Sequence, residues 1–214
     1  MTSNLTLIGA GPGDPDLLTI KAVNAIQNAD CVLFDALVDL ESVQKYAVDA
    51  ECIFVGKRAG YAHLSQEEIN QVILRKCGEY KEVVRLKGGD PLIFGRGHEE
   101  WKAAEEAGIN VTYIPGVSSV TSVPGLVGLP VTKRGVASSF WVGTAVDQQR
   151  NFSRDLVWAI HANCTVVILM GIGKIPEISH RFIQAGKGDL PIAVVASGST
   201  SRQAFWKGTV NELA

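Results

Sequence analysis

The sequence predicts an α/β protein of two domains, and three observations support this. Short apolar segments alternate with segments of helical periodicity over residues 1–114. This alternation ends at Pro115-Gly116, where a stretch rich in small residues begins. The 214 residues are 46% hydrophobic, enough for a sizeable core. Because continuous apolar strands alternating with helices are typical of a parallel sheet covered on both faces, we expect such a sheet in the first domain.

The first domain, residues 1–114, is predicted to contain five strands and four helices. The strands are expected at residues 5–8, 31–34, 52–55, 83–86 and 111–114, and the helices at 16–28, 40–47, 65–77 and 97–107. Ser65 begins a Ser-Gln-Glu-Glu sequence, which predicts a capping box at the start of its helix. Gly108 follows the last helix, where a left-handed backbone favours glycine.

The second domain, residues 115–214, is predicted from a shift in composition as well as from periodicity. Small residues mark its beginning: Ser118, Ser119, Ser122, Gly125 and Gly128. Strands are expected near 139–143, 165–170 and 191–196, and helices near 152–161 and 174–185. The chain therefore has a second α/β unit after the boundary.

Charge and composition argue against several function classes. The 20 basic and 22 acidic residues give a net charge of −2, so no basic field favours nucleic acid or an anionic membrane. No stretch of about 18 apolar residues occurs, and the first residues do not resemble a secretory leader. The four cysteines and four histidines show no metal-binding spacing. We expect a cytoplasmic protein with no metal, membrane or nucleic-acid partner.

A glycine-rich loop, Gly9-Ala-Gly-Pro-Gly13, follows the first predicted strand. A dinucleotide fingerprint would need its third glycine at position 14, which is Asp14. Two interpretations stay open: a tight structural turn, or a ligand-binding loop of another kind.

The most informative segment is Val84-Arg-Leu-Lys-Gly-Gly-Asp-Pro-Leu-Ile-Phe-Gly-Arg-Gly97. Its two adjacent glycines follow a strand, at the edge where open α/β sheets bind their ligands. Glycine leaves the backbone bare, so a ligand can approach closely. This segment is therefore a candidate binding loop.

These segments, with Val55-Gly-Lys-Arg-Ala-Gly60, Pro115-Gly-Val117 and Leu129-Pro-Val-Thr-Lys-Arg134, resemble the tetrapyrrole methylase family, and within it the branch that methylates uroporphyrinogen III. The likeness covers nearly all 214 residues. It implies an N-terminal parallel sheet, a C-terminal mixed sheet, a cleft between the domains, and a homodimer. It also implies S-adenosylmethionine as co-substrate and two methyl transfers that give precorrin-2, for sirohaem or cobalamin-type products.

The resemblance also implies roles for single residues. Asp35 and Lys57 match the proposed proton acceptor and proton donor. The methyl donor is expected to contact Pro12, Gly88, Gly89, Asp90, Ile93, Ser118, Ser119, Met170 and Gly198. A carboxylate is a suitable base for the proton that a methylated pyrrole must lose, if burial raises its pKa. The alternative for Asp35 is a helix N-cap.

A substrate with many carboxylates needs a concentrated set of cations. The candidates are Lys57, Arg58, Arg85, Lys87, Arg96, Lys133 and Arg134. We assign Arg58, Arg96, Lys133 and Arg134 to substrate binding and expect Lys57, Arg58 and Arg134 to converge on the cleft. The alternative is that each cation is solvated on the surface.

Some segments depart from the family pattern. Ser118-Ser119 and Thr132-Lys-Arg134 differ slightly, and the segment from Trp141 to Asp147 lacks a histidine common in relatives. The chain also ends early compared with relatives, so we expect an incomplete second domain, reduced stability and dependence on a dimer. Two alternative functions follow: a related methylase acting on another corrin or a diphthine precursor, and a catalytically impaired donor-binding module.

Overall fold

The computed structural model describes residues 3–38, 40–56, 64–147, 149 and 151–213, with only the backbone of 40–42. The chain divides into two compact units, Met1–Ser119 and Val120–Ala214. This division lies within five residues of the boundary at 114/115 that composition predicts.

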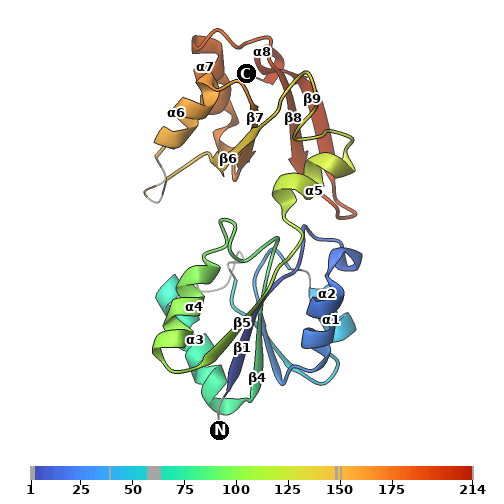
Figure 1. Ribbon diagram of the computed structural model, residues 1–214, viewed down its shortest axis with the longest axis vertical. Helices are drawn as coiled ribbons and strands as arrows, with labels where there is room; N and C mark the ends of the chain where they lie inside the picture. The colour runs from blue at the N-terminus through green and yellow to red at the C-terminus, as the bar shows by residue number, and fades with distance from the viewer. Residues whose placement is uncertain (1–2, 39, 57–63, 148, 150, 214) are drawn as a thin grey trace. The chain divides into compact units, whose positions relative to one another are not determined.

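The first unit contains a five-stranded sheet in which every pair of neighbours is parallel (Figure 1). The order is β3-β2-β4-β1-β5. The strands are β1 (Asn4–Gly9), β2 (Cys31–Phe34), β3 (Glu51–Phe54), β4 (Glu82–Lys87) and β5 (Asn110–Ile114). The five predicted strands and their parallel arrangement are confirmed. Because the strands are parallel, their carboxyl ends lie at one edge of the sheet.

The helices of this unit are α1 (Ile20–Gln27), α2 (Leu40–Tyr46), α3 (Gln66–Glu79) and α4 (Gly97–Glu106). The capping box of α3 is present: Ser65 Oγ accepts from the Glu68 amide, and Glu68 accepts from the Ser65 amide. The prediction of one helix over 16–28 was wrong in its first part. Pro15–Leu17 forms a separate 3₁₀ turn (η1) capped by Asp14, and Thr19 caps α1 by accepting from the Ala22 amide.

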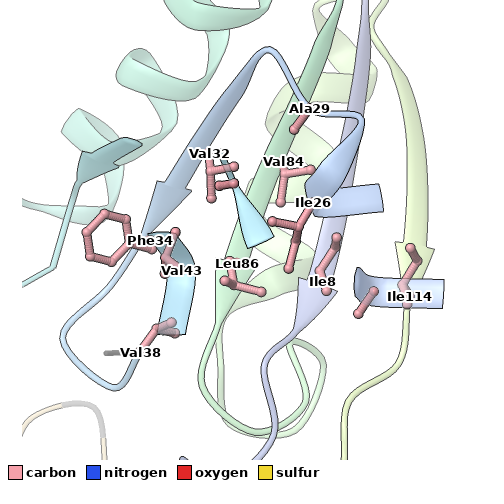
Figure 2. Close-up of a cluster of buried hydrophobic side chains, with 12 residues drawn as sticks. Ile8, Ile26, Ala29, Val32, Phe34, Val38, Val43, Val84, Leu86 and Ile114 are labelled. Atoms are coloured by element: carbon pink, nitrogen blue, oxygen red, sulfur yellow. The ribbon is translucent and has the colours of Figure 1, made fainter. Parts of the chain in front are cut away.

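Two hydrophobic cores cover the two faces of this sheet. Figure 2 shows the first, in which Ile26 of α1 and Val43 of α2 pack against strand residues such as Val84. On the other face, Ile73 of α3 and Ala104 of α4 join a second core. Alternate residues of one strand enter different cores, as a doubly covered sheet requires.

The second unit contains two pairs of strands. β6 (Phe140–Thr144) and β7 (Thr165–Leu169) are parallel, whereas β8 (Pro191–Ala196) and β9 (Ala204–Thr209) are antiparallel. The mixed strand directions are therefore present, but in two separate pairs. The other elements are α5 (Ser119–Leu126), α6 (Arg154–His161), η2 (Ile172–Lys174), α7 (Ile175–Gln184) and α8 (Val210–Leu213).

Four elements of this unit, α5, η2, β9 and α8, were not predicted. α5 consists largely of small residues and contains Pro124, and β9 is mostly exposed, so neither shows a clear periodicity. The core of the unit joins helix residues such as Leu156 and Phe182 to strand and loop residues. Within the described part of the chain, the helices are too short or too polar to cross a bilayer.

Three strand-end segments of the first unit meet with almost no space between them. A Cβ atom on Gly9 would collide with the backbone of Gly116, and one on Gly116 would collide with the carbonyl oxygen of Gly89. Glycine is thus required at positions 9 and 116 by close backbone approach. This contact fixes three loops at the carboxyl edge of the sheet.

Gly116→Ala should lower the free energy of unfolding by about 1–3 kcal/mol, because the added methyl group meets backbone that must shift. Chemical denaturation of the variant and the parent measures this. Gly78→Ala is the matched control, since Gly78 is helical and its Cβ would meet nothing within 4 Å. That variant should gain about 0.5–1 kcal/mol. Equal stability of Gly116→Ala and the parent would contradict the close contact.

Candidate active site

The loop between β4 and α4 follows the central strand of the sheet, β4, whose neighbours are β2 and β1. The Gly89 amide donates to the Gly11 carbonyl at 2.7 Å, and the Gly11 amide donates to the Gly89 carbonyl at 3.2 Å. Both glycines have left-handed backbones, with φ of 65° at Gly89 and 75° at Gly11. The first glycine-rich loop is therefore tied to the second by a two-bond bridge.

Gly89 lies at an open position on this bridge. A Cβ atom added there would meet nothing within 4 Å, in contrast to the crowded Gly9 and Gly116. At Gly88, by comparison, a Cβ would collide with the side chain of Leu37. The bridge thus presents bare backbone and free space at one point, which suits close approach by a ligand.

Asp90 joins the loops with its side chain. It is 6% exposed. Its Oδ2 accepts from the Tyr113 hydroxyl at 2.6 Å and from the Gly116 amide at 3.1 Å, and its Oδ1 accepts from the Leu92 amide at 2.9 Å. The carboxylate therefore organises the site through contacts within the chain. Sequence reasoning missed Tyr113, which has no motif of its own.

Asp35 follows β2 at the same edge of the sheet, and its side chain is 21% exposed. Its Oδ1 accepts from the Leu37 amide at 3.1 Å, and its Oδ2 lies 3.5 Å from Arg85 Nη2. The N-cap interpretation is wrong, because α2 begins only at Leu40 and Asp35 instead closes a turn on its own chain. Lys57, the predicted proton donor, lies outside the described residues.

The predicted substrate cations differ in burial: some are buried and others are exposed. Arg85 and Lys87 are 1% and 5% exposed, so their candidacy as cations at an open mouth was wrong: both pair with buried Glu100. Arg96 is exposed and pairs with Glu99 at 2.6 Å. In the second unit, Lys133 and Arg134 are exposed on a loop before β6. Arg58 lies outside the described residues, so the predicted convergence of Lys57, Arg58 and Arg134 stays a prediction.

The remaining predicted donor contacts lie on strand-end loops and on α5. In the first unit, Pro12 belongs to the first glycine-rich loop and Ile93 to the β4–α4 loop, while Ser118 directly precedes α5 and Ser119 begins it. In the second unit, Met170 directly follows β7, and Gly198 lies between β8 and β9. A Cβ on Gly198 would collide with the side chain of Val123 of α5. The structure thus brings the first-unit residues to one edge, and it places Gly198 beside α5.

Backbone strain falls on the same loops. Among the described residues, the non-glycine residues with positive φ are Phe94, Arg96, Met170, Ser197 and Ser199. Each is a predicted site residue or a neighbour of one. Left-handed backbone is unfavourable for these residue types, and such strain clusters at functional sites. Met170 is also 65% exposed, which is unusual for a large apolar side chain.

The fold and these loops define the class of the protein: a two-unit α/β protein with a candidate ligand site of glycine-rich loops at the carboxyl edge of a parallel sheet. The family model for Tetrapyrrole (Corrin/Porphyrin) Methylases matches residues 4–214. The chain belongs to this family.

Relatives with known names agree with this assignment. A uroporphyrinogen-III C-methyltransferase of Methanobacterium ivanovii is 44% identical over 97% of this chain and 89% of its own length. One from Methanocaldococcus jannaschii is 41% identical over 100% of this chain and 89% of its own length. A siroheme synthase of Methylobacillus flagellatus is 43% identical over 97% of this chain, which spans 44% of that longer protein.

Solved structures show the same fold. A uroporphyrin-III C-methyl transferase from Thermus thermophilus, complexed with S-adenyl homocysteine, has a TM-score of 0.85 and 36% identity, covering 99% of this chain and 86% of that one. A cobalt precorrin-4 methyltransferase has a TM-score of 0.85 and 29% identity, covering 98% and 87%.

Tyr113→Phe should lower the free energy of unfolding by about 1 kcal/mol near neutral pH, because it removes the hydrogen bond to Asp90. Burial, together with that bond, raises the pKa of Tyr113 to about 12. The unfolded phenol ionises near pH 10, so the advantage of the parent over the variant should be complete below pH 10 and disappear between about pH 10 and 12. Denaturant unfolding of both proteins across this range measures the difference. An advantage independent of pH up to 12 would contradict the bond.

Proposed function

We propose that this chain transfers two methyl groups from S-adenosylmethionine to carbon atoms of uroporphyrinogen III, giving precorrin-2. The observation that carries the proposal is the Gly11–Gly89 bridge with its open glycine, in a chain 44% identical over nearly its full length to a uroporphyrinogen-III C-methyltransferase. The structure of a relative with a product-like ligand supports S-adenosylmethionine as the co-substrate.

The charge distribution at the bridge suits this donor. S-adenosylmethionine supplies a methyl group from a positively charged sulfur, and that charge is lost during transfer. A strong anion beside the sulfur would stabilise the ground state more than the transition state. Asp90 is the carboxylate nearest in sequence to Gly89, and its oxygens already bind Tyr113, Gly116 and Leu92. Backbone atoms therefore provide the surface toward the donor.

Asp35 is the proposed proton acceptor. In the reaction a carbon–carbon bond forms between the methyl group and a pyrrole carbon, while the carbon–sulfur bond breaks and its electron pair stays on sulfur. The methylated macrocycle is then cationic and loses a proton, which Asp35 takes. The partly exposed carboxylate at the strand end supports this role. Lys57 is proposed as the proton donor from the resemblance alone.

The substrate carboxylates would be held by cations on exposed loops. Arg96, Lys133 and Arg134 are exposed and are proposed for this role together with Arg58. Guanidinium groups suit carboxylates because they can form two parallel hydrogen bonds.

We further propose a cytoplasmic homodimer that supplies a sirohaem or cobalamin-type route. All four cysteines are free thiols, as is usual in reducing compartments. The second candidate function is methylation of a later corrin intermediate, favoured by the TM-score of 0.85 to the cobalt precorrin-4 methyltransferase. The lower identity to that enzyme, 29%, favours uroporphyrinogen III as substrate.

The purified chain, incubated without oxygen with uroporphyrinogen III and methyl-labelled S-adenosylmethionine, should give a macrocycle carrying two labelled methyl groups by mass spectrometry. A corrin intermediate labelled in place of uroporphyrinogen III would support the second candidate. Donor binding without any transfer would indicate an impaired donor-binding module.

Asp35→Asn should lower the methylation rate about a hundredfold or more, because it removes the base but leaves the glycine loops unchanged. Donor affinity, measured by calorimetry with S-adenosylhomocysteine, should stay within about twofold of the parent. A parallel loss of affinity and rate would make Asp35 a structural residue instead.

Gly89→Val should abolish donor binding in the same calorimetric assay, because its side chain fills the open space at the bridge. Gly108→Val is the matched control. Gly108 also has a left-handed backbone, with φ of 77°, and free space around its Cβ position, but it lies beyond the end of α4. Normal binding by Gly89→Val, or equal losses in both variants, would contradict the proposed donor site.

A further inference from the structure

The sheet face covered by α3 and α4 changes character along its length. Toward the amino ends of the strands it is apolar, with Leu5, Cys31 and Val83 level with one another in the second core. Nearer the carboxyl ends, charged side chains of β4 replace the apolar ones. They belong to the strand-end ion cluster: Asp35 after β2, Arg85 and Lys87 on β4, and Glu100 on α4. Except for Asp35, the side chains of this cluster are at most 6% exposed.

Glu100 is the centre of this cluster. Its Oε1 accepts from Arg85 Nε at 3.2 Å, from Lys87 Nζ at 2.9 Å and from Gln66 Nε2 at 3.2 Å. Its Oε2 is buried and has no hydrogen-bond donor among the described residues. The carboxylate thus pairs with two cations through one oxygen. Its other oxygen is buried without a hydrogen bond from the described residues, which lowers the free energy of unfolding.

Each of the three side-chain nitrogens of Arg85 has a partner within the protein. Its Nε binds Glu100, and its Nη1 donates to the carbonyls of Leu86 at 3.0 Å and Leu33 at 3.4 Å. Its Nη2 lies 3.5 Å from Asp35 Oδ2. The guanidinium therefore has one fixed orientation, and one of its nitrogens is directed to the proposed proton acceptor.

Stability alone does not explain the cluster. Buried ion pairs are often no more stabilising than apolar residues of similar volume, because desolvation offsets the attraction. Here Arg85 links the buried part of the cluster, through Glu100, to the partly exposed carboxylate of Asp35 at the edge.

We propose that Arg85 and Glu100 are positioning residues for Asp35: Glu100 anchors the guanidinium, and the guanidinium fixes the orientation of the carboxylate that accepts the proton. The inference rests on the proposed function of Asp35. It assigns to buried Glu100 a role in the reaction although that residue does not reach the reacting atoms.

The charged groups that surround Asp35 in this cluster are Arg85 and Lys87 on β4 and Glu100 on α4. Burial, and then the charge of Arg85, lowers the pKa of Lys87.

The direct test combines kinetics with NMR of the Asp35 carboxyl carbon at one neutral pH in the full chain, with Asp35→Asn used to assign the signal. In Arg85→Met and in Glu100→Gln the signal should shift or broaden, because the carboxylate loses its fixed neighbour. In both variants kcat should fall at least about fivefold with donor KM unchanged, because the glycine loops are left intact.

Lys76→Met is the matched control. Lys76 bridges Glu51 and Glu79 at 2.9 Å and 2.8 Å, but Glu51 begins β3 and so lies at the opposite edge of the sheet. This variant should leave the Asp35 carboxyl signal and kcat unchanged. If Arg85→Met does not fold, Arg85→Lys decides: it keeps the charge but not the fork, so kcat should fall and the Asp35 signal should change.

The outcomes separate the two proposals. An unchanged Asp35 signal or an unchanged kcat in Arg85→Met and Glu100→Gln would overturn the positioning role even if Asp35→Asn is inactive. Full activity of Asp35→Asn would instead overturn the catalytic role of Asp35, whatever the carboxyl signal shows.

Discussion

The close contact of three glycine segments at the carboxyl edge of the sheet is the constraint on which the site depends. Gly9, Gly89 and Gly116 come from three different strand ends, and side chains at Gly9 and Gly116 would force them apart. Asp90 holds the arrangement by binding the Gly116 amide and the Tyr113 hydroxyl. Because β1 lies between β4 and β5, the order of the strands brings these loops together. The sheet therefore determines where bare backbone is exposed.

The strand-end ion cluster lies beside this glycine contact, on the side of β4 where β2 is its neighbour. There the residues at the strand end are charged, and Glu100 of α4 balances Arg85 and Lys87. Neutral backbone thus lies at the proposed site of the methyl donor, and charged side chains lie beside the proposed proton acceptor. This division suits a reaction in which a cationic sulfur loses its charge while a proton leaves the substrate.

Much of the first unit could be predicted from the sequence, since apolar strands and helical periodicity alternate there and Ser65 and Gly108 mark helix ends. The division of residues 16–28 into η1 and α1 was not predicted. The spacing of apolar residues gives no information on the side-chain caps, Asp14 and Thr19, at which these two elements begin. The exposed β9 and the Pro-containing α5 lack the patterns on which prediction relies. At the site, motifs indicated Gly89 and Asp35, whereas the burial of Arg85 and Lys87 and the role of Tyr113 depend on tertiary contacts that local sequence does not encode.

A crystal structure of this chain with S-adenosylhomocysteine tests the central claim most directly. The ligand is expected to lie against the backbone of Gly88, Gly89 and Asp90, with the Asp90 carboxylate still bound to Tyr113 and Gly116. Asp35 should stay paired with Arg85 at the same edge. A ligand bound elsewhere, or a ligand held by the Asp90 carboxylate after release of Tyr113, would contradict it.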